Sequence, residues 1–211
     1  MRMLLLLLGA IFLLGCVQPP AQAPAATPAA TSVISAKVAT PTPTALPTNL
    51  SNEMQTMADA LKAVNIVNGE FLETFSEIND AKEAANAYAS HLDGLDPEAN
   101  GTVFLRGNID AARHFLASNE YYLGAMNTGK RVTQNFSCKD RKAYELAMNL
   151  TSSSIAEGRK GTDILYSLAG KYPAIAVQSG TQLAADLIGA FYDGMEESVN
   201  ETLAIINDKC G

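Results

Sequence analysis

The chain has 211 residues, of which 22 are acidic and 15 are basic, so its formal net charge is −7. Binding to a nucleic-acid backbone needs clustered positive charge, so this balance argues against nucleic acid as a partner. After the N-terminal segments described below are set aside, roughly 160 residues remain. That length is enough for one domain with its own core and too short for two typical domains.

The first fifteen residues are typical of an export signal. A short positive start at Arg2 precedes an apolar run over residues 4–14. A transmembrane helix takes about twenty residues, so this run is too short to span a bilayer but has the length of a signal-peptide core. We therefore expect residues 1–15 to be removed and the remaining chain to face outside the cytoplasm.

The end of that segment, Leu13-Leu14-Gly15-Cys16, resembles the lipobox of prokaryotic lipoproteins. The resemblance implies cleavage before Cys16 and a diacylglyceryl group on its sulfur. Two acyl chains, at about 0.8 kcal/mol per buried methylene, hold a protein stably on a membrane. The chain is thus predicted to be lipid-anchored through Cys16. The alternative is a plain secretory signal in which Cys16 is an ordinary cysteine.

A tether is predicted over residues 16–50. Seven of the nine prolines lie between residues 17 and 50, among Ala, Thr and Ser, and the only charge in that stretch is Lys37. Such a composition cannot bury enough apolar surface to offset the entropy lost on ordering, and its prolines favour extended polyproline geometry. The folded domain is therefore expected to span residues 51–211.

The exported chain also carries five Asn-x-Ser/Thr sequons, which are acceptor sites for N-linked sugar. These candidate glycosylation sites are Asn49, Asn100, Asn135, Asn149 and Asn200.

The first predicted helix covers residues 54–92. Apolar residues recur there at alternating steps of three and four, from Met54 to Leu92, as on one face of a helix. Ser51 stands ahead of the segment as a candidate cap, and Gly94 follows its last apolar residue. We expect one long helix, with a possible kink at Gly69.

The same spacing returns three more times, and strand-like alternation was found nowhere. Long amphipathic helices joined by short connections favour an antiparallel bundle with the four helices running up, down, up and down. The three further apolar stripes run from Leu105 to Met126, from Tyr144 to Tyr172 and from Val177 to Ile206, and the connections between the helices are predicted near residues 93–101, 128–137 and 171–173.

The two cysteines of the predicted domain are read as one disulfide, because an even pair in an exported chain is most simply bonded. Cys138 opens the third helix and Cys210 closes the fourth, so antiparallel neighbours bring them to one end. The same topology places the tether at that end. Basic residues gather there too and face the membrane if the bundle stands upright, although nearby acidic residues offset them; these basic residues are Lys130, Arg131, Lys139, Arg141 and Lys142.

Polar and small residues interrupt the apolar stripes, which either permits close helix packing or lines a ligand pocket. Packing is the simpler interpretation. The pocket hypothesis has stacking groups close by in Phe71, Tyr122 and Tyr144. The polar residues on the stripes that would line such a pocket are Asn68, Asn119, Thr151 and Thr162.

No motif for catalysis, a metal or a cofactor was found in the sequence, so the chain is not expected to be an enzyme. Histidine is limited to His91, which suits the dipole at the end of its helix, and His114, expected in a surface ion pair with Asp110 one turn away. The sequence therefore favours a non-catalytic lipoprotein that binds a partner or serves as a scaffold in the cell envelope. The alternative is a sensor-like helical bundle that binds a small ligand.

Overall fold

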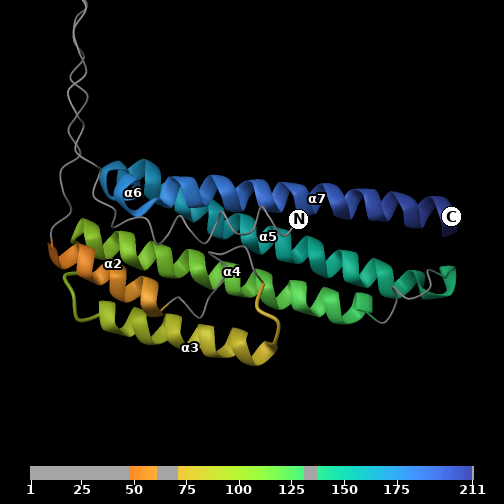
Figure 1. Cartoon of the computed structure of the whole chain (residues 1–211), viewed down its shortest axis with the longest axis horizontal. Helices are drawn as coiled ribbons and strands as arrows, with labels where there is room; N and C mark the ends of the chain where they lie inside the picture. Colours follow the sequence, from red (N-terminus) through yellow and green to blue (C-terminus); the bar gives the residue numbers. More distant parts are fainter. Residues whose placement is uncertain (1–47, 61–70, 131–136, 211) are drawn as a thin grey trace, which may run out of the picture.

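The computed structural model describes residues 48–60, 71–130 and 137–210, and across these residues the chain is all helical, without a strand (Figure 1). The predicted all-α class is confirmed for them. The elements are α2 (Thr48–Ala60), α3 (Phe75–Leu92), α4 (Asn100–Lys130), the short 3-10 helix η4 (Cys138–Asp140), α5 (Arg141–Lys171), α6 (Pro173–Ser179) and α7 (Thr181–Cys210). The predicted signal and almost all of the predicted tether lie outside the described residues.

The single long helix predicted over residues 54–92 is wrong. Helix α2 ends at Ala60, residues 71–74 are not helical, and α3 begins at Phe75. Thr74 starts α3 with a capping box, in which its side chain accepts from the Glu77 N–H and the Glu77 carboxylate accepts from the Thr74 N–H. Such a cap satisfies N–H groups at a helix start and so favours a new helix at this point. The predicted kink site, Gly69, lies outside the described residues.

The last predicted helix is also divided. Helix α6 ends at Ser179, and Gly180 follows with a φ of 69°, a left-handed conformation that glycine adopts without steric cost. This break changes the direction in which the α6 side chains face. Val177, a member of the predicted apolar stripe, is 72 % exposed, whereas Ala176 beside it is buried.

Consecutive long helices run antiparallel. Between α3 and α4, Lys82 pairs with Glu120 near one end and Asp93 pairs with Arg106 near the other. Helices α4 and α5 are matched in the same way, since residues later in α4 contact residues earlier in α5. Helices α5 and α7 follow the pattern too. Within this pair Arg159 contacts Asp193 and Tyr166 contacts Asp186, and Cys138 of η4, just ahead of α5, is bonded to Cys210 at the end of α7.

The buried side chains follow most of the predicted stripes. The core contains Ile78 and Ala85 from α3, and Leu116 from α4, all with no exposed surface. Packing of these faces removes apolar area from water, at about 25 cal/mol per Å², and this is the main force that holds the helices together. No described helix is both long and apolar enough to cross a membrane.

The two ends of the body differ from the predicted arrangement. Leu50, near the start of α2, packs so closely on Gly101, at the start of α4, that a Cβ on Gly101 would lie 2.8 Å from its side chain. Figure 1 shows the C-terminal end of α7, where Cys210 of the disulfide lies, at the other end of the long helices. The expectation that the tether enters at the disulfide end is therefore wrong. The break between α2 and α3 adds one reversal of direction, which moves the start of α2 to the opposite end.

Candidate functional site

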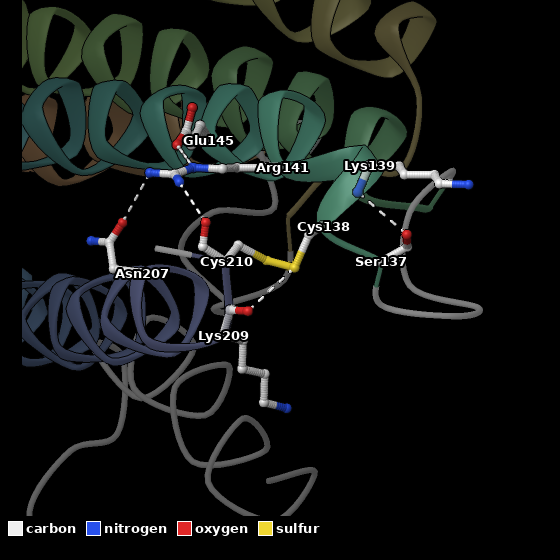
Figure 2. The surroundings of a disulfide bond; sticks show 8 residues. All are labelled: Ser137, Cys138, Lys139, Arg141, Glu145, Asn207, Lys209 and Cys210. Atoms are coloured by element: carbon white, nitrogen blue, oxygen red, sulfur yellow. Dashed lines mark hydrogen bonds and ion pairs between the residues drawn. A yellow bond between two sulfur atoms is a disulfide. The ribbon is translucent and has the colours of Figure 1, made fainter.

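The disulfide end is closed by covalent and polar contacts (Figure 2). Cys138 and Cys210 form a disulfide, with their Cα atoms 5.4 Å apart. Beside it the Arg141 guanidinium donates to the Cys210 carbonyl oxygen over 3.0 Å and to Asn207 over 3.4 Å, and pairs with Glu145 over 2.7 Å. Arg141 is one of the five basic residues expected to face the membrane, and here it binds the last turn of α7.

The residues predicted to line a pocket fall in separate places. Tyr144 is buried beside Ile206 near the disulfide. Thr151 is half-buried and donates to the Ala147 carbonyl oxygen of its own helix. Thr162 is buried and donates in the same way to Gly158. These hydroxyl groups satisfy themselves within α5, as Ser and Thr often do inside helices.

Two other predicted residues, Asn119 and Tyr122, lie together on α4. Tyr122 stacks on Phe71, with ring centroids 4.0 Å apart. Asn119 has no exposed surface, and its Oδ1 accepts from the Leu72 N–H over 2.8 Å. Among the described residues, its Nδ2 group has no hydrogen-bond partner. Asn119 thus fixes the segment that leads into α3, and its other amide group is buried without a partner in the described part of the chain. Asn68 lies outside the described residues.

Sequence reasoning missed a chain of hydroxyl groups in the core. Ser118 of α4 lies 2.9 Å from Ser154 of α5 and 2.9 Å from the Tyr192 hydroxyl of α7, measured between oxygens. All three side chains are buried. Burial raises the pKa of Tyr192 to about 12, and the hydrogen bond with Ser118 only partly opposes this shift. The three helices are therefore tied together by neutral polar contacts between buried side chains.

Gly158 makes the room for this arrangement. The Tyr192 ring lies directly over it, and a Cβ at position 158 would overlap the ring. The sequence signal was present, because Gly158 stands on the apolar stripe of α5. What could not be read from one sequence was that an aromatic side chain of α7 fills the space.

A groove of about 390 Å³ lies on the outer side of the α5 and α7 pair. Gly189 and Ala190 of α7 leave space between the helices, and Thr162 is the one predicted pocket residue that lines it. A Cβ at Gly189 would stand 3.5 Å from the Tyr166 hydroxyl, an ordinary contact distance, so this glycine does not mark tight packing. The remaining lining residues are Arg159, Asp163, Tyr166, Asp186 and Asp193.

The groove is acidic. Arg159 pairs with Asp193 over 2.9 Å and also with Glu196, and these carboxylates raise its pKa. The Tyr166 hydroxyl donates to Asp186 over 3.0 Å, and burial together with this carboxylate raises the pKa of Tyr166. Asp186 accepts a second bond from the neutral side chain of Gln182. One guanidinium therefore faces three lining carboxylates.

The two histidines join helices. His91 Nε2 lies 2.9 Å from a Glu53 carboxylate oxygen of α2, and the Tyr88 hydroxyl donates to the Glu53 carbonyl oxygen over 2.8 Å. These contacts hold α2 on α3.

The ion pair expected between His114 and Asp110 is wrong. His114 Nδ1 instead lies 2.9 Å from a Glu157 carboxylate oxygen, because α5 packs beside α4 and brings this carboxylate within reach. Asp110 pairs with Arg113.

Three of the predicted sequon residues, Asn100, Asn149 and Asn200, have exposed side chains, as sugar attachment requires. Asn135 and the side chain of Asn49 lie outside the described part of the chain. Within that part, no group of three or more histidine, cysteine or acidic side chains is arranged to hold a metal ion.

In comparisons with known proteins, no family model, no curated protein and no solved structure matches this chain.

Proposed function

We propose that this protein is an exported lipoprotein, anchored to the outer face of a membrane through Cys16, whose helical body acts without catalysis by binding a partner or serving as a scaffold. The observation that carries the proposal is the disulfide between Cys138 and Cys210. Disulfides form and persist in oxidising compartments outside the cytoplasm. That compartment agrees with the lipobox-like residues and with a proline-rich tether.

The anchor is tested by mass spectrometry of the protein extracted with detergent from the membranes of an expressing prokaryote. We expect the N-terminal peptide to begin at Cys16 and to carry a diacylglyceryl group. The Cys16→Ser variant should leave the membrane fraction for the soluble one. A mature chain that begins elsewhere, or an unmodified Cys16, contradicts the proposal.

For the body we propose an antiparallel bundle in which α4, α5 and α7 supply three columns and the α2–α3 pair supplies the fourth. The antiparallel pairings and the shared core support this arrangement. Spin labels at Asn52 and Lys209 test it. A helix rises about 1.5 Å per residue, so the labels should lie on the order of 40 Å apart. A separation below about 20 Å would mean that the start of α2 lies at the disulfide end, and this would contradict the proposed arrangement.

A second candidate function is binding of a small ligand in the core, as in sensor-like bundles. The observation in its favour is the buried Asn119 Nδ2 group, which has no partner among the residues that the structure describes and lies next to the stacked rings of Phe71 and Tyr122. A ligand carbonyl could accept from that group, because an unsatisfied buried donor costs about 1–3 kcal/mol. A thermal-shift screen of small polar metabolites tests this function. Stabilisation that is lost in Asn119→Leu supports it, and a screen without any stabilisation counts against it.

A further inference from the structure

The outer groove between α5 and α7 differs from the rest of the helix pairing because its tyrosine and aspartate side chains are open to solvent. Tyr166 is 39 % exposed, and Asp163, Asp186 and Asp193 are exposed as well. The lining residues recur every three or four positions on both helices, so the groove extends over about two turns, or roughly 10 Å.

The charges of the groove are only partly balanced. Arg159 is already held between Asp193 and Glu196. Asp186 is bonded to neutral donors, and within the described residues neither Asp163 nor Asp186 forms an ion pair with a cationic side chain. Two carboxylates therefore present negative charge in the same groove as an exposed aromatic ring.

We propose that this groove is a docking surface for a segment of a partner protein that carries arginine or lysine. Asp163 and Asp186 accept its cationic groups, and the Tyr166 ring offers a face on which a guanidinium stacks. Gly189 and Ala190 leave space for the stems of these side chains. The inference rests on the proposed binding function and names the chemistry of the partner.

The open shape favours a protein segment over a small molecule. Small-ligand sites usually enclose most of the ligand surface in a mainly apolar pocket. This groove lies between two helices and is open to solvent, and most of its lining residues have polar or charged side chains. A side chain that projects from a larger surface needs no such enclosure, because the rest of the partner covers it. Charge complementarity at such a rim mainly sets specificity and association rate.

The test uses the full chain in a neutral detergent and two designed helical peptides. The peptides are identical except that one carries arginine at four positions where the other carries glutamate. Binding is followed by fluorescence anisotropy at low salt and at about 150 mM salt, where the Debye length is about 8 Å. We expect the arginine peptide to bind at least about tenfold more tightly than the glutamate peptide, and more weakly at the higher salt.

Two pairs of variants localise the binding. The double variant Asp163→Asn with Asp186→Asn should weaken binding of the arginine peptide about tenfold. The control double variant, Asp80→Asn with Glu83→Gln, removes the same charge from the exposed face of α3 and should leave the affinity within about twofold of wild type. Gly189→Leu should fill the groove and weaken binding. Gly194→Leu, in the same helix at a site with open space around it, is its control.

Equal losses in the two charge variants overturn the proposal, because binding would then follow overall charge. Spermidine that binds as tightly as the peptide also overturns it, since a small polyamine would then suffice. Circular dichroism confirms that each variant is folded. The result is independent of the anchor: a lipidated Cys16 with a groove that ignores the arginine peptide rejects the docking surface and leaves the proposed lipoprotein standing.

Discussion

Two tyrosines lie between the same two helices, α5 and α7, one on the inner side of the pair and one on the outer side. Tyr192 of α7 lies over Gly158 of α5 on the inner side, is 1 % exposed, and bonds to a neutral serine. On the outer side Tyr166 of α5 reaches toward Gly189 of α7, is 39 % exposed, and bonds to a carboxylate. The inner pair leaves no room even for a methyl group, whereas the outer pair does.

The difference shows how one helix interface can serve two purposes. A ring pressed on a glycine in a dry core fixes how two helices pack, because any added atom forces the core to move. A ring above a glycine on the surface leaves space for another molecule. We therefore expect substitutions on the inner side to change stability and substitutions on the outer side to change binding.

The largest effect is expected for Gly158→Ala. The added Cβ overlaps the Tyr192 ring, so the ring must move and its bond to Ser118 is lost. We expect the free energy of unfolding to fall by about 3 kcal/mol. Urea denaturation followed by circular dichroism measures this change. A loss below about 0.5 kcal/mol would mean that the ring does not occupy that space.

Tyr192 should also make stability depend on alkaline pH. Its pKa in the folded state is about 12, above the ordinary value of 10.0, so the folded protein favours the neutral phenol. This preference contributes about 2–3 kcal/mol to the free energy of unfolding. The contribution is present in full below pH 10 and is lost as the pH rises toward 12. Other tyrosines titrate there as well, so the measurement is the difference between wild type and Tyr192→Phe in rapid pH-jump unfolding. Parallel pH profiles for the two proteins would contradict the prediction that Tyr192 contributes to the loss of stability at alkaline pH.

A smaller effect is expected for Tyr192→Phe at neutral pH. The variant keeps the ring but removes the hydroxyl group, and Ser118 retains its contact with Ser154. A loss of about 1 kcal/mol is expected for one hydrogen bond. Tyr166→Phe, measured in the same way, should stay within about 0.5 kcal/mol of wild type because its hydroxyl is near solvent. Equal losses would remove the distinction between the two sides.

The smallest effect, with the opposite sign, is expected for Gly189→Ala. The new methyl group meets Tyr166 and Thr162 at ordinary distances of 3.5 and 3.6 Å. Alanine favours a helix over glycine by up to about 1 kcal/mol, so the melting temperature should rise slightly. Thermal unfolding by calorimetry checks this, and a clear fall in melting temperature would indicate that the groove is tightly packed after all.

The all-helical class, the periodic burial and the pairing of the cysteines are features of the described fold that the sequence predicted well. Stripe residues such as Ile109, Ile155 and Ile206 are buried, and Cys138 meets Cys210. Spacing alone did not reveal that the chain leaves the helical path before Phe75, since the apolar stripe continues through the break. The capping pair Thr74 and Glu77 was the local signal that could have predicted it.

The groove was harder to predict, because it depends on how two distant helices are rotated about their axes. Thr162 was a candidate only as a polar residue on an apolar stripe, and Asp163, Tyr166 and Asp186 looked like ordinary surface residues. Which acidic residue of α5 faces which of α7 is set by contacts between helices, such as Tyr192 on Gly158. Such contacts leave no periodic trace in a single sequence.

The contrast between the inner and outer sides is tested most directly by nitrating the native protein with tetranitromethane and locating the modified tyrosines by mass spectrometry. The account predicts that Tyr166 is nitrated in the folded protein while Tyr192 reacts only after unfolding. Nitration of both at the same rate under native conditions would contradict it, because the inner side would then be as open as the groove.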